Sequence, residues 1–181
     1  MPGHDPNHVA VARAVGAGLA RAKLGLVYGG GRIGLMGAVA DAAMEAGGEV
    51  IGVIPDFLMQ REVAHRGATD LEVVDTMHQR KQRMVELSGA FLTLPGGFGT
   101  FDETVEIITW RQLGLHDKPI LILDAGGWAK ALLGLFETAI AQGFAREETR
   151  RLFEVVPDAE TALARLTSLP ASSTATATEL A

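Results

Sequence analysis

Short apolar runs alternate with longer stretches of helical periodicity along most of the chain. The apolar runs predict buried strands at residues 24–28, 49–54, 71–74, 89–94, 119–124 and 152–156. Between them, apolar residues recur at helical spacing, which predicts helices at residues 6–23, 38–46, 77–87, 127–142 and 158–166, and one carrying Phe101, Val105 and Ile108. Residues 56–67 lack a clean period, so we expect a short helix and a loop there.

This alternation indicates an α/β fold: a Rossmann-like, doubly wound, mostly parallel sheet with helices on both faces. The length of 181 residues suits one domain, which we place at residues 1–169 and expect to bind a nucleotide. Residues 170–181 are rich in Ala, Ser and Thr and have no large apolar residue before Leu180, so we expect a disordered tail.

The net charge and the absence of cysteine exclude several classes of partner and of site. A formal net charge of −6 argues against a general binder of nucleic acid or membrane surfaces, because both are polyanions. The absence of cysteine excludes disulfides, thiolate metal sites and a cysteine nucleophile, and suits a reducing compartment. No signal peptide or membrane span is recognisable, so we expect a soluble, cytoplasmic protein.

Two glycine loops carry the candidate chemistry. Residues 29–37 follow the strand at 24–28, and residues 95–103 follow the strand at 89–94. Glycine lets the backbone approach a ligand closely, and the start of the following helix offers unpaired N–H groups to an anion. Because ligands bind beyond the carboxyl ends of parallel strands, both loops are expected to meet at one crevice. In the plain structural alternative, Thr100 and Glu103 form only a capping box.

A dinucleotide site is a second interpretation of the first loop. Residues 29–34 fit G-x-G-x-x-G, and Asp56 after the next strand is a candidate acid for a ribose. However, Pro55 separates Asp56 from the strand end, and a dinucleotide site does not explain the second glycine loop. A Walker loop is excluded because no Gly-Lys-Ser/Thr ending is present.

The predicted helix at 77–87 carries the one dense basic cluster, with His78, Arg80, Lys81 and Arg83. Such clusters are usually a solvated face. Neither His78 nor His116 has a second ligand at metal-site spacing, so we expect structural roles and no metal. Two further residues stay open: Glu106, as a partner of Glu103 or a surface residue, and Trp110, as a core or interface residue.

The two loops, with Met77-His78-Gln79-Arg80-Lys81 between them, resemble the LOG family of cytokinin riboside 5′-monophosphate phosphoribohydrolases. The resemblance covers roughly residues 6–166 and includes residues 109–114 and 116–119. The family was long labelled lysine decarboxylase, but this sequence offers no identifiable pyridoxal phosphate site. The resemblance implies hydrolysis of the N-glycosidic bond of an adenosine 5′-monophosphate, typically N6-substituted, to the free base and ribose 5-phosphate. It implies a homodimer and no cofactor.

The resemblance also assigns residues. Glu103 fills the catalytic glutamate position, where a carboxylate stabilises the positive charge that develops on the ribose and orients water. Arg80 fills the catalytic arginine position and Lys81 assists. The remaining substrate-binding candidates are Glu62, Gly97, Phe98, Gly99, Thr100 and Thr109 at family contact positions, with Gly96 in the same loop and Gly30 and Gly31 in the first loop. The competing functions are a non-catalytic nucleotide or cofactor carrier of the same fold and a nicotinamide oxidoreductase.

One departure from the family concerns the start of the chain. Family members usually open with an additional apolar strand ending in a Gly-Ser loop, whereas residues 1–6 are a piece that normally follows that loop. We therefore expect the sheet to lack the family's first strand, near its middle, and the crevice to lose one wall of polar groups.

Overall fold

In the computed structural model, residues 2–59, 65 and 67–169 are described. Glu62 and the predicted tail lie outside this part of the chain. The α-helices are α1 (Pro6–Arg21), α2 (Gly34–Glu45), α3 (Asp56–Met59), α4 (Met77–Leu87), α5 (Phe98–Gln112), α6 (Lys130–Ala141) and α7 (Ala159–Thr167). The strands are β1 (Leu26–Tyr28), β2 (Val50–Pro55), β3 (Asp70–Val74), β4 (Phe91–Thr93), β5 (Ile120–Leu123) and β6 (Glu154–Val156), and the 3-10 helices are η1 (Ala125–Gly127) and η2 (Glu147–Leu152).

The strands form two parallel sheets of three, in the orders β1-β2-β3 and β4-β5-β6. Leu26 of β1 lies opposite Val50 of β2, and Phe91 of β4 lies opposite Ile120 of β5. The parallel α/β architecture is therefore confirmed, but one continuous sheet is the wrong picture for the described residues, because β1 and β4 are not paired.

Helix α1 joins the two sheets through one hydrophobic core. The Asp5 side chain accepts a hydrogen bond from the backbone of Asn7 at 2.8 Å, and Pro6 begins the helix, a combination that favours initiation. Gly16 lets α1 approach α2, because a Cβ there would lie 2.1 Å from the Val39 carbonyl oxygen. The core under α1, α2 and α7 draws on both sheets, because Leu26 of β1 packs against it and its buried residues include members of β5 and β6: Ala12, Val15, Leu19, Leu35, Val39, Leu121, Leu123, Val156 and Ala162.

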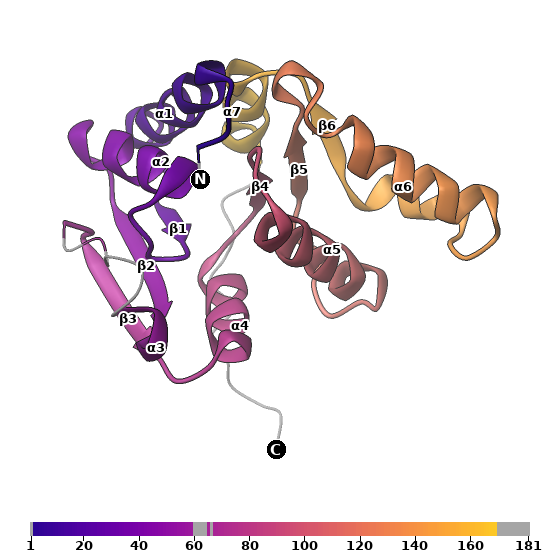
Figure 1. Cartoon of the computed structure of the whole chain (residues 1–181), viewed down its shortest axis with the longest axis horizontal. Coiled ribbons are helices and arrows are strands. Elements are labelled where there is room, and N and C mark those ends of the chain that lie inside the picture. Colours follow the sequence, from indigo (N-terminus) through magenta and orange to yellow (C-terminus); the bar gives the residue numbers. More distant parts are fainter. Residues whose placement is uncertain (1, 60–64, 66, 170–181) are drawn as a thin grey trace.

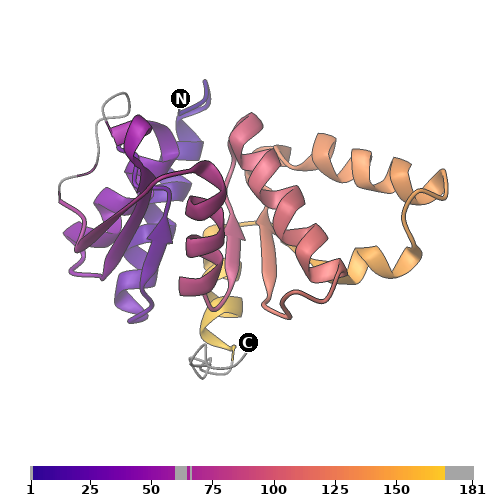
Figure 2. The same ribbon diagram turned by 90° about the horizontal axis from the view of Figure 1, so that it is seen from below.

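The opposite face carries α4 and α5, so helices cover both faces as predicted. Helix α4 lies between the first sheet and α5, at the join of the two halves (Figures 1 and 2). Under α5, Ile108 packs with Ile120 and Ile122 of β5. Helix α6 extends away from the rest of the molecule in both views, whereas η2 returns to α5, where Arg111 donates to the Leu152 carbonyl at 2.8 Å.

Several element boundaries differ from the prediction. Helix α2 begins at Gly34 rather than Ala38, and α5 begins at Phe98 rather than near Phe101. Helix α6 begins at Lys130 rather than at residue 127, β6 begins at Glu154 rather than at residue 152, and η1 and η2 were not predicted. Both early starts lie inside glycine loops, where apolar periodicity carries no signal. No helix in the described part of the chain is long and apolar enough to cross a membrane.

Candidate active site

Arg80 is held at the join of the two sheets by its helix and by two backbone carbonyls. Helix α4 begins with a capping box, in which Thr76 Oγ1 accepts from the Gln79 N–H and Gln79 Oε1 accepts from the Thr76 N–H, each at 3.1 Å. Arg80 follows one residue later and is 7% exposed. Its Nε donates to the Val53 carbonyl at 3.1 Å and its Nη2 to the Gly29 carbonyl at 3.3 Å.

The glycines of the first loop make room for this arginine. A Cβ at Gly29 would lie 1.6 Å from Arg80 Nη2, so the guanidinium can hold its observed position only beside a glycine. Gly30 has φ +72°, and a Cβ there would lie 2.9 Å from Ile54 Cβ. Gly29, Gly30 and Gly31 are all buried, and Gly29 and Gly30 make room for side chains of the protein itself.

Glu103 meets Arg80 from the second half of the molecule. Its Oε1 accepts from Arg80 Nη1 at 2.9 Å, and its side chain is 37% exposed while that of Arg80 is 9% exposed. The pair therefore joins α4 to α5 and leaves the carboxylate accessible to a ligand. A charged hydrogen bond of this kind fixes both side chains in one orientation.

The capping-box alternative for Thr100 and Glu103 is wrong. Helix α5 has Gly97 as its N-cap with no side-chain hydrogen bond, and Thr100 lies inside the helix. The Thr100 side chain fills the space beside Gly96, where a Cβ would lie 2.0 Å from Thr100 Oγ1. Behind it, Thr104 Oγ1 donates to the Thr100 carbonyl at 2.7 Å and lies 3.0 Å from Thr93 Oγ1.

The second glycine loop is open. A Cβ at Gly97 or at Gly99 would meet nothing within 4 Å, and Phe98 between them is 91% exposed. The first N–H groups of α5 have no partner within the helix, and they carry its positive dipole end. These N–H groups lie at the start of the helix that carries Glu103, in an arrangement that suits the binding of an anion.

Lys81 is tied to two carboxylates of α5. Its Nζ lies 2.7 Å from Asp102 Oδ2 and 3.2 Å from Glu106 Oε2, with the lysine side chain 15% exposed. Burial alone would lower the pKa of Lys81, but the hydrogen bonds and charges of Asp102 and Glu106 outweigh it and raise this pKa. Lys81 is thus a second cross-link from α4 to α5, and Glu106 is its partner rather than a partner of Glu103.

The other predicted residues are not gathered at the pair. Thr109 is exposed on α5, and its hydroxyl donates to the Val105 carbonyl of the same helix at 2.8 Å. Asp56, the candidate ribose acid, is exposed in α3. Glu62 lies outside the described residues. The structure brings together Arg80, Lys81, Gly29 and Glu103, while Gly96–Thr100 lead directly into the helix that carries Glu103.

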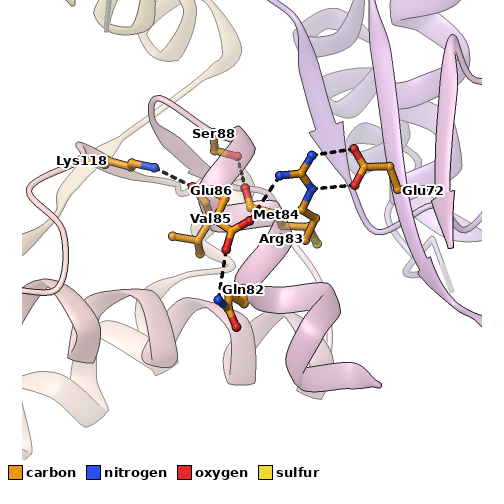
Figure 3. Close-up of polar contacts among 8 residues, drawn as sticks. All are labelled: Glu72, Gln82, Arg83, Met84, Val85, Glu86, Ser88 and Lys118. Atoms are coloured by element: carbon orange, nitrogen blue, oxygen red, sulfur yellow. Dashed lines mark hydrogen bonds and ion pairs between the residues drawn. The ribbon is translucent and has the colours of Figure 1, made fainter. Parts of the chain in front are cut away.

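Two anchors of α4 were missed from the sequence (Figure 3). Arg83 donates to both oxygens of Glu72 in β3, at 2.6 and 3.0 Å, and lowers the pKa of that carboxyl. Lys118 Nζ donates to the Val85 carbonyl near the end of α4 at 2.6 Å, and burial lowers the pKa of Lys118. Because β3 belongs to the first sheet and Lys118 lies two residues before β5, α4 is hydrogen-bonded to both halves. Neither partner lies at a spacing that a sequence pattern would reveal.

Comparison with known proteins decides the family. The family model described as "Possible lysine decarboxylase" matches residues 36–166. A cytokinin riboside 5′-monophosphate phosphoribohydrolase of Rhodococcoides fascians is 47% identical over 169 residues, covering 93% of this chain and 85% of the relative. One from Arabidopsis thaliana is 40% identical over 91% of this chain and 77% of its own. The chain belongs to the LOG family. Both relatives are named as phosphoribohydrolases of a nucleotide, whereas the description of the family model names the decarboxylation of lysine.

Solved structures of two proteins that carry or bind the molybdenum cofactor have a fold similar to that of this chain. The molybdenum cofactor carrier protein of Chlamydomonas reinhardtii matches with a TM-score of 0.67 at 22% identity, covering 90% of this chain and 87% of its own. The molybdenum cofactor binding protein of Rippkaea orientalis matches with a TM-score of 0.69 at 19% identity, covering 91% and 88%. At these identities the likeness shows a shared fold and nothing about function.

Proposed function

We propose that this LOG protein hydrolyses the N-glycosidic bond of adenosine 5′-monophosphates, typically N6-substituted, and releases the free base and ribose 5-phosphate. The observation that carries the proposal is the Arg80–Glu103 pair at 2.9 Å next to an open glycine loop. The names of relatives at 40% and 47% identity support the same reaction class.

Each group has a task in this reaction. The backbone N–H groups at the start of α5 bind the 5′-phosphate. Arg80, fixed by the carbonyls of Val53 and Gly29, holds Glu103 in place and presents a permanent positive charge to the nucleotide. As the bond to the base breaks, positive charge develops on the ribose, and the Glu103 carboxylate stabilises it and orients the attacking water.

The test is Glu103→Gln, assayed with AMP and with isopentenyladenosine monophosphate for release of free base. Glutamine keeps the hydrogen bond from Arg80 but has no negative charge, so the fold should persist while turnover falls by roughly a hundredfold or more. Glu86→Gln is the matched control, because Glu86 is an exposed carboxylate of α4 whose contacts are to Gln82 and Arg83. Full activity in Glu103→Gln would exclude Glu103 from catalysis.

A non-catalytic nucleotide or cofactor carrier is the second candidate, because an open glycine loop at the start of a helix would suit binding without turnover as well. A carrier would retain nucleotide tightly, release no base, and keep its affinity in Glu103→Gln. Parallel incubation with L-lysine addresses the family description, and decarboxylation of lysine would contradict the nucleotide reaction.

We also propose that the protein acts as a homodimer in the cytoplasm. Large apolar side chains remain exposed on and after α5 and α6, namely Val105, Leu113, Leu115, Leu135 and Phe144. Exposed apolar surface of this kind favours association. Sedimentation equilibrium at micromolar concentration should give twice the chain mass, and monomer alone would refute the dimer. The absence of cysteine is consistent with the reducing cytoplasm.

A further inference from the structure

Trp128 contacts the second glycine loop from a different part of the chain. It follows η1, after β5, and its Nε1 donates to the Gly96 carbonyl at 3.0 Å. Its ring stacks on Phe101 in the first turn of α5, with centroids 5.6 Å apart and planes inclined by 14°. The backbone next to it is also fixed, because Asp124 Oδ1 accepts from the Ala129 N–H at 2.8 Å.

This contact sets the direction of the loop's N–H groups. The peptide between Gly96 and Gly97 is trans, so its C=O and N–H point in opposite directions. Because the Gly96 carbonyl points at Trp128, the Gly97 N–H points away from Trp128. The next carbonyl, that of Gly97, accepts from the Phe101 N–H at 3.1 Å, so the Phe98 N–H is turned toward the N-terminal side of α5. Both N–H groups belong to exposed residues.

We propose that Trp128 is a positioning residue for the anion loop. It touches no substrate, and it holds the Gly96 carbonyl so that the N–H groups of Gly97 and Phe98 converge on a phosphate. The inference rests on the proposed function, in that the phosphate belongs to a nucleoside 5′-monophosphate. It assigns part of the phosphate affinity to Trp128, which lies 32 residues from Gly96 along the chain.

A purely structural role for Trp128 predicts a different outcome. Trp128 also packs against the cluster of Ile108, Ile120 and Ile122 under α5, so any large change at this position would disturb the core. Trp128→Phe retains an aromatic ring against Phe101 and removes the donor. A positioning role weakens the binding of phosphate groups alone, whereas a packing role lowers stability or weakens all ligands alike.

The experiment compares the wild-type protein with Trp128→Phe for binding of AMP, adenosine and inorganic phosphate, together with kcat and KM for AMP. Loss of one orienting hydrogen bond should weaken AMP and phosphate about three- to tenfold, leave adenosine unchanged, and raise KM with little change in kcat. Trp110→Phe is the matched control: the protein has two tryptophans, and Trp110 makes no hydrogen bond to the loop among the described residues. Its affinity for AMP should equal that of the wild-type protein.

A second measurement does not depend on the folding of Trp128→Phe. In Trp110→Phe, Trp128 is the one remaining tryptophan, so its fluorescence should change on titration with inorganic phosphate. Unchanged fluorescence at saturating phosphate, equal AMP affinity in Trp128→Phe, or equal weakening of adenosine and AMP would each overturn the inference. If the wild-type protein binds AMP in this Trp128-dependent way and releases no base, the hydrolase proposal fails while the positioning role stands.

Discussion

The two glycine loops of this protein are alike in sequence and opposite in use. In the first, Gly29 lies against Arg80 and Gly30 against Ile54, and both residues are buried. In the second, Gly97 and Gly99 are exposed with open space where a side chain would project. The missing side chains of the first loop make room for Arg80, and those of the second leave the open space in which we propose that the phosphate binds.

The comparison also explains how two separate sheets share one candidate site. The half with β1, β2 and β3 supplies the carbonyls that hold Arg80, and the half with β4, β5 and β6 supplies α5 with Glu103. Helix α4 lies between the halves and is bonded to both. A glycine-rich motif after a strand is therefore insufficient evidence for a phosphate site, because the same spacing serves internal packing equally well.

Among the substitutions that compare the two loops, the largest expected effect comes from filling the first loop. Gly29→Ala would place a methyl group 1.6 Å from Arg80 Nη2, so the guanidinium must leave its carbonyl partners and its bond to Glu103. We expect a loss of about 1–3 kcal/mol in unfolding free energy, as for overpacking in general. Base release from AMP should fall at least tenfold, since the pair no longer holds its geometry.

Gly134→Ala is the control for this substitution. Gly134 lies inside α6, where a Cβ meets nothing within 4 Å, so alanine should raise stability by up to about 1 kcal/mol. Urea unfolding gives the free energies and an AMP hydrolysis assay gives the rates. Wild-type activity in Gly29→Ala would show that the first loop tolerates a side chain and would remove the contrast between the loops.

Local patterns predicted most elements, because the apolar spacing that indicates a helix or a strand is a property of neighbouring residues. Helix α4 was predicted at its observed bounds, residues 77–87. The start of α5 was misplaced, since Phe98, Gly99 and Thr100 carry no apolar period. The separation of β1 from β4 depends on which strands lie next to one another in space, and sequence patterns do not contain that information.

The sequence named the residues of the candidate site but did not predict the contacts that hold them in place. Arg80 and Glu103 followed from the family motifs, and the structure places them in contact. The anchors of Arg80 are backbone carbonyls 27 and 51 residues away, and any residue type offers a carbonyl. Lys81 was predicted to assist substrate, but its bonds to Asp102 and Glu106 depend on how α4 meets α5.

An intermediate effect is expected from filling the second loop. The methyl group of Gly99→Ala enters open space within α5, so the melting temperature should stay the same or rise slightly because alanine favours helix. The same methyl group lies where a phosphate approaches, so AMP should bind several-fold more weakly while adenosine is unaffected. Calorimetric titration of both ligands measures this, and unchanged AMP affinity would place the anion elsewhere.

The smallest effect is expected at Arg83, one turn beyond Arg80 on α4. Arg83 pairs with Glu72 at the edge of the first sheet and with Glu86 on its own helix, and its side chain is 39% exposed (Figure 3). Arg83→Met should therefore cost no more than about 1 kcal/mol of stability and leave AMP hydrolysis unchanged. Two arginines of one basic cluster would then have different roles, as the two loops do: Arg80 belongs to the candidate site, and Arg83 only stabilises the fold.

The pH dependence identifies the ion pair as the source of that cost. Arg83 lowers the pKa of Glu72 in the folded protein, so the stabilisation is present above the ordinary pKa of a glutamate. It is lost as the pH falls through the lowered pKa, because the carboxyl then becomes protonated. Melting curves should show the wild-type protein above Arg83→Met at neutral pH, with the two converging in acid. A difference that persists in acid would instead assign the role of Arg83 to the packing of its aliphatic chain against α4 and β3.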